Sequence, residues 1–251
     1  MPQIIAQQTM AKDFHSSRLK GKVAIVTAST DGIGFAIAKR LGDEGASVII
    51  SSRKEENVKK ATENLRKNGI QAEGVAKTKF GGLDILVSNA AVNPSVAATL
   101  ETEENAWDKI FEINVKCSWL LAKEAYPELI KRGGGSIVFI SSIAGYQPME
   151  PLGVYSVSKT ALLGLTKAIS SEVARENIRV NCVAPGIVAT KFASAITSSE
   201  VGKEKSLSTV PMNRFGKPDE IAGAVAYLVS DDAAYTTGET IVVAGGSHSR
   251  L

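Results

Sequence analysis

The chain has 251 residues, of which 44% are hydrophobic and 22% charged, and its formal net charge is +3. This length suits one domain with a sizeable core. The small net charge, with no basic stripe interleaved with aromatic residues, argues against nucleic-acid binding. No apolar run reaches the roughly 18 residues that a membrane span needs, and Cys117 and Cys182 lie in apolar stretches that favour buried thiols over a disulfide.

The first 19 residues are polar and predict a flexible arm, followed by one domain over residues 20–251. In that domain continuous apolar runs alternate with helical patterns, which predicts an α/β fold with one doubly wound parallel sheet covered on both faces. The predicted strands are 22–27, 46–51, 84–88, 136–141, 178–183 and 240–243, with a weaker candidate at 71–75, and the predicted helices are 34–43, 54–67, 106–132, 154–176 and 218–230.

A glycine-rich turn follows the first predicted strand. Residues 27–34 read TASTDGIG, so Gly32 and Gly34 stand where the strand becomes a helix. A nucleotide pyrophosphate binds backbone N–H groups at a helix N-terminus and needs glycines for close approach. The turn therefore predicts a dinucleotide site, although a lone glycine pair also fits an ordinary βα turn. Ala28 stands where such turns usually have their first glycine, and its methyl group fits if the backbone keeps a negative φ.

Two cations follow the second predicted strand. The chain there reads Ser52, Arg53, Lys54, with no Asp or Glu. A carboxylate at this point binds the ribose hydroxyls and repels a 2′-phosphate, whereas an arginine accepts the phosphate. The residues therefore favour NADP(H) over NAD(H). The alternative is that Arg53 and Lys54 are simply the first charged residues of a solvent-exposed helix.

Tyr155 and Lys159 are four residues apart at the start of a predicted helix, so they share one face. A free tyrosine has a pKa of about 10 and exchanges protons poorly near neutrality, but a nearby ammonium favours the phenolate and lowers that pKa. Ser142 follows the strand 136–141, and its hydroxyl can hold a substrate oxygen beside that of Tyr155. Taken alone, the pair also fits a surface tyrosine near a solvated lysine. Together with the glycine turn and the serine, it predicts a proton-transfer site.

In this combination the chain resembles the short-chain dehydrogenase/reductase family, which implies a Rossmann-like fold over residues 20–251. The matching features are residues 27–34, Asn89-Ala90-Ala91, Asn114, Ser142, the segment YSVSK at 155–159 and the segment PGIVAT at 185–190.

The resemblance also implies roles for individual residues. Asn114, Ser142, Tyr155 and Lys159 correspond to a catalytic tetrad, in which Asn114 holds a water in a proton relay from Lys159 and Ser142 contacts the substrate. Thr190 is expected to hydrogen-bond the nicotinamide carboxamide. The predicted cofactor-binding residues are Ser29, Gly32, Ile33, Gly34, Ser52, Arg53, Lys54, Asn89, Tyr155, Lys159, Pro185, Gly186, Val188 and Thr190, and no metal ligands are predicted.

Three segments, ASTDGIGFAIA, DILVSNAAVNP and VSKTALLGLTK, resemble the peroxisomal branch of the family that comprises NADP-dependent carbonyl reductases and retinol dehydrogenases. The chain ends in Ser249, Arg250 and Leu251, close to the peroxisome address SKL. The expected location is the peroxisome, with the cytoplasm as second choice. We also expect a homo-oligomer, either a dimer or a tetramer.

The stretch before the strand 84–88 is short. Only residues 76–83 separate it from the candidate strand 71–75, whereas a parallel crossover normally needs about a dozen residues. Eight extended residues reach about 27 Å, less than the path over the sheet face between strands about 14 Å apart. This predicts that strand three and its following helix are lost or displaced and that strand two lies at the edge. Apolar surface would then be uncovered around Phe111, Val115 and strand four.

The leading functional hypothesis is an NADP(H)-dependent oxidoreductase that passes hydride between a nicotinamide and a small carbonyl, dicarbonyl or retinoid substrate, with Tyr155 as acid/base. The segment 191–215, predicted to be a polar and mobile loop, would frame the substrate pocket. The rival hypothesis is an isoform impaired by the short segment, which binds NADP(H) but acts only in binding or subunit pairing.

Overall fold

The computed structural model describes residues 18–74, 81–193 and 200–247. Its centre is one sheet of seven parallel strands in the order β3-β2-β1-β4-β5-β6-β7, which confirms the doubly wound α/β fold. Residues 1–17 of the predicted arm 1–19 and the carboxy-terminal tripeptide lie outside the described residues, whereas Leu19 at the end of the arm is buried. The strands are β1 (Val23–Val26), β2 (Ser47–Ile50), β3 (Ala72–Gly74), β4 (Ile85–Ser88), β5 (Gly135–Ile140), β6 (Ile178–Pro185) and β7 (Thr240–Val243).

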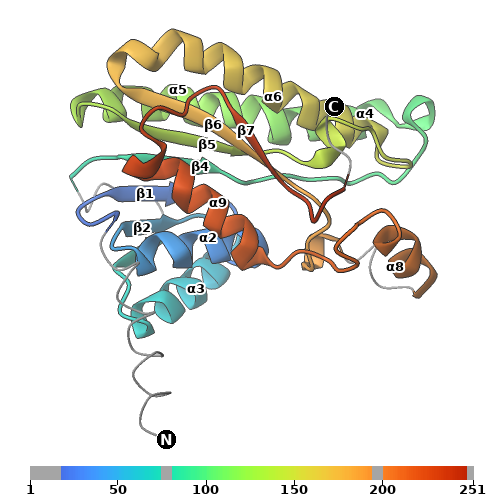
Figure 1. Ribbon diagram of the computed structural model, residues 1–251, viewed down its shortest axis with the longest axis horizontal. Helices are drawn as coiled ribbons and strands as arrows, with labels where there is room; N and C mark the ends of the chain where they lie inside the picture. The colour runs from blue at the N-terminus through green and yellow to red at the C-terminus, as the bar shows by residue number, and fades with distance from the viewer. Residues whose placement is uncertain (1–17, 75–80, 194–199, 248–251) are drawn as a thin grey trace, which may run out of the picture.

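Helices cover both faces of the sheet. Figure 1 shows α2, α3 and α9 on one face and α5 and α6 on the other. This arrangement follows from parallel pairing, because each connection must return the chain across a face before the next strand can begin. The helices are α2 (Gly32–Asp43), α3 (Glu55–Lys67), α4 (Glu104–Phe111), α5 (Cys117–Lys131), α6 (Gly153–Val173), α8 (Glu200–Leu207) and α9 (Pro218–Val229).

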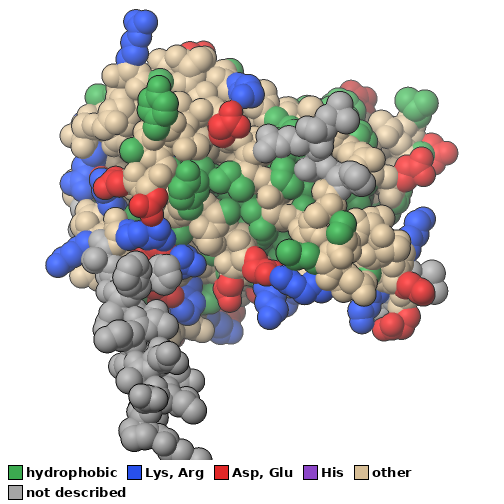
Figure 2. All heavy atoms as spheres, viewed as in Figure 1, with side chains coloured by type: hydrophobic (Ala, Val, Ile, Leu, Met, Phe, Trp, Pro, Cys, Tyr) green, Lys and Arg blue, Asp and Glu red, His purple; other side chains and the backbone are tan. Residues whose placement is uncertain are grey.

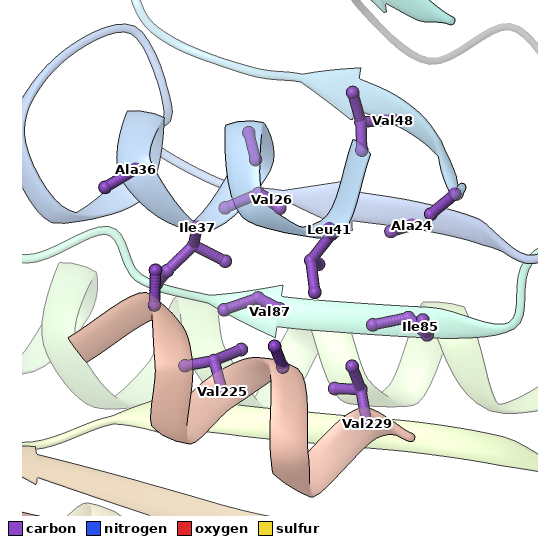
Figure 3. Packing of buried hydrophobic residues seen from close by; sticks show 14 of the residues in the cluster. Ala24, Val26, Ala36, Ile37, Leu41, Val48, Ile85, Val87, Val225 and Val229 are labelled. Atoms are coloured by element: carbon purple, nitrogen blue, oxygen red, sulfur yellow. The ribbon is translucent and has the colours of Figure 1, made fainter. Parts of the chain in front are cut away.

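The core on the α2 side is built from a helical repeat of apolar residues. Ile37 and Leu41 lie one turn apart on α2 and are fully buried. In Figure 3 they point toward Val225 of α9 and toward Val87 of β4. Each such side chain contributes roughly 1.5–3 kcal/mol relative to an exposed position. This packing fixes α2, and therefore the glycine turn that precedes it, against the centre of the sheet.

Strand three is present, so the prediction of its loss is wrong. β3 pairs in parallel with β2 from Ala72 to Gly74, β2 is therefore not an edge strand, and β4 lies beside β1. The prediction assumed a five-residue strand and hence too long a return path. Because β3 has three residues, residues 75–84 remain for the connection, and ten residues reach about 33 Å. The described part of this connection, residues 81–84, contains no helix, and residues 75–80 lie outside the described residues.

The predicted uncovering of strand four is also wrong. Ile85, Leu86 and Val87 are all buried, and Leu86 packs with Ala122 and Leu129 of α5. The predicted exposure of apolar residues on the helix 106–132 is confirmed in part, since Phe111 and Val115 are partly exposed. The neighbouring Trp107 stacks on Phe111 with ring centroids 4.8 Å apart and stays 40% exposed. Among the described residues, α5 therefore covers this face of β4.

Two features of the chain were not predicted. The helix predicted at 106–132 is interrupted by a π-helical segment, Glu112–Lys116, that separates α4 from α5. The segment 191–215, predicted as a loop, contains α8. Among the described helices, none is long and apolar enough to span a membrane. On the face shown in Figure 2, acidic and basic side chains are interspersed, with no large area of one sign.

Candidate active site

The predicted site residues meet at the carboxyl edge of the sheet. The glycine turn follows β1, Asn89 follows β4, Ser142 follows β5 and Gly186 follows β6. β1 and β4 are neighbours from which the chain winds outward in opposite directions. Parallel sheets bind ligands at this reversal point.

The glycine turn is tied to β4 through Asn89. The Asn89 side-chain Nδ2 donates to the carbonyls of Thr27 (3.0 Å) and Ala28 (3.2 Å). A Cβ on Gly34 would lie 2.4 Å from the Ala28 carbonyl oxygen and 2.6 Å from Asn89 Nδ2, so no larger residue fits there. Asn89 and Gly34 therefore hold the turn close to the sheet.

Ala28 departs from the sequence-based expectation. Its φ is +49°, in the left-handed region, and not negative as the fit of its methyl group had suggested. The conformation costs an alanine roughly 1–2 kcal/mol relative to the right-handed region. The Asn89 side chain and the β1–α2 packing hold the residue there, so the turn keeps its shape without a glycine at this position.

The turn and its surroundings fit a dinucleotide. The Gly32 N–H at the start of α2 donates to the side chain of the N-cap residue Asp31 (2.8 Å), and a Cβ on Gly32 would lie 3.4 Å from Thr190 Cγ2, so the segment after β6 lies close to the turn. Arg53 and Lys54 are exposed beyond the end of β2, where the adenosine phosphate would lie. Ser29 is fully buried and its hydroxyl donates to the Val26 carbonyl (2.6 Å).

An ion pair that the sequence did not reveal joins the two sides of this region. Lys191 Nζ lies 2.5 Å from Asp31 Oδ2, and the hydrogen bond from Lys191 holds the pKa of Asp31 below its ordinary value. Both side chains are largely exposed, so the pair contributes little to stability. It links the N-cap of α2 to the segment that follows Thr190.

The structure brings Tyr155 and Ser142 together, as predicted. Ser142 caps the short helix Ile143–Gly145, and its Oγ accepts from Ala144 N (3.1 Å). Burial raises the pKa of Tyr155 to about 12, and a hydrogen bond with the Ser142 side chain opposes that rise. The net shift of this pKa is therefore upward in the cofactor-free protein, not downward as predicted, because the desolvation of the phenol dominates. Phe192 packs against the Tyr155 ring with centroids 6.0 Å apart.

Lys159 lies beneath Tyr155 and is 2% exposed. Its Nζ donates to the Ile140 carbonyl (2.8 Å) and lies 5.5 Å from the Tyr155 ring centroid. Burial lowers the pKa of Lys159 to about 8. A Cβ on Gly145 would lie 2.9 Å from the Lys159 carbonyl oxygen, so this glycine lets α6 lie close to the short helix Ile143–Gly145 that follows β5.

Asn114 lies in the π-helical segment and is fully buried. Its Oδ1 accepts from Val92 N (2.8 Å), and its Nδ2 donates to the Val92 carbonyl (3.1 Å) and to Ser158 Oγ (3.0 Å). Both amide hydrogens are therefore in use. A water can bind Asn114 only at an oxygen lone pair, and the backbone carbonyl already accepts from Ser118 Oγ (3.0 Å).

Lys159 predicts how the stability of the cofactor-free protein changes with pH. Its pKa is about 8 when folded against an ordinary 10.5, so between these values the unfolded chain binds more protons. The free energy of unfolding should therefore rise with pH, by up to about 1.4 kcal/mol per pH unit from this group. We expect Tm to rise from pH 8 to 9 more steeply in the wild type than in a Lys159→Met variant.

Two other buried groups act in the opposite direction. Burial raises the pKa of Cys182 to about 11 and that of Tyr155 to about 12, so each destabilises the fold as pH rises through its ordinary value of 9 or 10. Both groups are retained in Lys159→Met, so the difference between the two proteins reports the contribution of Lys159. Equal changes of Tm in wild type and Lys159→Met would contradict the prediction.

Similarity to known proteins identifies the family of this chain. The family model described as Enoyl-(Acyl carrier protein) reductase matches residues 27–248. Dehydrogenase/reductase SDR family member 4 from Bos taurus is 50% identical over 249 residues, covering 93% of this chain and 89% of that relative. Tropinone reductase-like 3 from Erythroxylum coca is 52% identical over 257 residues, covering 96% and 98%. L-Sorbose reductase from Gluconobacter frateurii, solved with NADPH and L-sorbose, has a TM-score of 0.85 and 32% identity, covering 94% and 99%. The chain therefore belongs to the short-chain dehydrogenase/reductase family.

Proposed function

We propose that this protein is an NADP(H)-dependent oxidoreductase that reduces small carbonyl or dicarbonyl compounds, or retinoids, and runs in reverse on the alcohols. The observation that carries the proposal is the pairing of the Ser142 and Tyr155 side chains above the buried Lys159. This group stands at the same sheet edge as the glycine turn. The names of the two relatives above, a dehydrogenase/reductase and a tropinone reductase-like protein, support reduction as the reaction.

The residues divide the chemistry between them. When bound, NADPH supplies the hydride that adds to the carbonyl carbon. Ser142 and Tyr155 hold the carbonyl oxygen by their hydroxyls, and Tyr155 transfers its proton to that oxygen as the alcohol forms. The ammonium of Lys159 favours the phenolate that remains on Tyr155. The carbonyl thus gains one hydride and one proton.

The rival function is NADP(H) binding without turnover. Its rationale was a sheet damaged by the short segment, and the seven-stranded sheet removes much of that rationale. The loss of NADPH absorbance with a reactive dicarbonyl, measured beside an NADPH thermal-shift assay, separates the two functions. Turnover supports the proposal, whereas a thermal shift without turnover of any dicarbonyl or retinoid supports the rival. A kinetic panel with both substrate classes then identifies the preferred one.

Arg53 and Lys54 predict the choice of cofactor. Both cations are exposed beyond β2, and residues 51–54 include no Asp or Glu; Glu55 follows as the first residue of α3. The two cations can receive a 2′-phosphate. NADPH should bind at least about tenfold more tightly than NADH, equivalent to about 1.4 kcal/mol. In an Arg53→Ala/Lys54→Ala variant the two dissociation constants should converge through weaker NADPH binding. Equal dissociation constants in the wild type would contradict this prediction.

The proposed location of the protein in peroxisomes rests on its carboxy-terminal tripeptide. Ser249, Arg250 and Leu251 lie outside the described residues, so the support is the sequence alone. Deleting the tripeptide should move a tagged protein from peroxisomes to the cytosol. An unchanged distribution in imaged cells would show that the tripeptide is coincidental. The proposed homo-oligomer is tested separately, by light scattering of the purified protein.

A further inference from the structure

Ser158 lies between Tyr155 and Lys159 in the sequence, but its side chain is directed away from the reacting group and is fully buried. Its Oγ donates to the Tyr155 backbone carbonyl (2.6 Å) and accepts from Asn114 Nδ2 (3.0 Å). The first bond lies within the first turns of α6, and the second crosses to the π-helical segment. One hydroxyl therefore connects the turn that carries Tyr155 to a separate element.

Asn114 is itself fixed on its other side. Its amide exchanges two hydrogen bonds with the backbone of Val92, in the segment that follows β4. Ser118 Oγ donates to the Asn114 carbonyl and accepts from Ser88 Oγ at the end of β4, with both bonds at 3.0 Å. β4 is a central strand of the sheet. Through these hydrogen bonds, Asn114 connects Ser158 to β4.

The opposite side of the same turn is tied to β5 and the short helix after it. Ser141 Oγ donates to the Lys159 carbonyl (2.8 Å), and Thr160 Oγ1 donates to the Gly145 carbonyl (2.7 Å). These bonds set how close α6 lies to β5. The bond between Ser158 and Asn114 ties the turn instead to the π-helical segment and, through Val92, to the chain that follows β4.

We propose that Ser158 is a positioning residue that holds the first turns of α6, and with them Tyr155, in register with β4 through its hydrogen bond with Asn114. The inference rests on the proposed function for its meaning, because the position of the Tyr155 hydroxyl matters when it transfers a proton. Misplacement of a reacting group by about 1 Å costs up to about a hundredfold in rate. Loss of the Ser158 hydroxyl also leaves one buried Nδ2 hydrogen of Asn114 without an acceptor.

The test compares two serines of α6. Ser170 makes the same type of bond to its own helix, Oγ to the Lys167 carbonyl (2.9 Å), and is also buried, so Ser170→Ala is the matched control. In Ser158→Ala we expect kcat to fall about tenfold to a hundredfold, with the dissociation constant for NADPH within about twofold of wild type. The alkaline limb of the pH profile should also shift. Ser170→Ala should change neither kcat nor the alkaline limb of the pH profile. A Ser158→Ala kcat within twofold of wild type, or equal losses in both variants, overturns the proposal.

A second readout does not depend on turnover. The 13Cζ resonance of Tyr155, identified by its absence in Tyr155→Phe, should shift in Ser158→Ala and stay in place in Ser170→Ala. If the wild type reduces no carbonyl compound, the proposed function fails, and an unmoved resonance separately overturns the positioning role. If Ser158→Ala does not fold, Ser158→Cys keeps a weaker donor and acceptor at the same place. This variant should give an intermediate kcat and resonance, and wild-type values for both would overturn the proposal.

Discussion

Replacing Tyr155 with Phe is expected to lower kcat by about 10²- to 10⁴-fold, the range that general acid–base catalysis supplies, while NADPH binding survives. The substitution removes one hydroxyl and keeps the ring, whose contact with Phe192 is retained. Because proton transfer and not cofactor binding is lost, the dissociation constant measured by NADPH fluorescence should change less than twofold. Steady-state kinetics with a dicarbonyl substrate measure the loss of kcat.

Tyr126→Phe is the matched control for this experiment. Tyr126 is 39% exposed and lies in the second half of α5, whereas Asn114 precedes the first residue of that helix. Loss of the Tyr126 hydroxyl should leave kcat unchanged. A Tyr155→Phe enzyme with near-normal kcat would show that another group donates the proton.

Replacing Gly34 with Ala is expected to weaken NADPH binding by about tenfold to a hundredfold and to destabilise the fold by about 1–3 kcal/mol. The added methyl group would lie 2.4 Å from the Ala28 carbonyl oxygen, 2.6 Å from Asn89 Nδ2 and 2.9 Å from Ser29 Cα. Two of these three atoms belong to the backbone, so a change of rotamer cannot relieve the contact and the turn itself must move. NADPH titration and thermal unfolding measure the two effects.

Gly164 of α6 provides the control, because a Cβ there would meet nothing within 4 Å and the residue is exposed. Gly164→Ala should stabilise the helix by about 0.5–1 kcal/mol and leave NADPH affinity unchanged. If Gly34→Ala bound NADPH as tightly as the wild type, the turn would not be the close-packed cradle that the geometry describes.

The sequence predicted the fold wherever apolar runs are long. The strand predicted at 240–243 has those bounds in the structure, and β1, β2 and β4 lie within one or two residues of the prediction. It failed at β3, whose residues Ala72 to Gly74 carry no apolar alternation and owe their conformation to pairing with β2. It also failed at the π-helical segment, because hydrophobic periodicity registers a continuous helix and does not show which carbonyl is displaced.

The candidate site was predicted to a similar extent. Motif spacing identified Ser142, Tyr155 and Lys159, which the structure brings together. It could not reveal Ser158 as a partner of Asn114, since that contact joins residues 44 positions apart. The φ of Ala28 was misjudged because the alternative of a held left-handed alanine depends on the Asn89 side chain, 61 residues away. Both contacts exist only in the folded chain.

The brevity of β3 has a consequence for the behaviour of the protein in concentrated solution. An edge strand presents unpaired N–H and C=O groups that another chain can extend, and long apolar edges favour aggregation. Here the edge has three residues, ends in Gly74, and includes Glu73, whose carboxylate lies 2.7 Å from the Arg66 guanidinium. A charged side chain at so short an edge leaves little backbone for a second sheet to join. The short β3 thus limits growth of the sheet by strand addition at this edge.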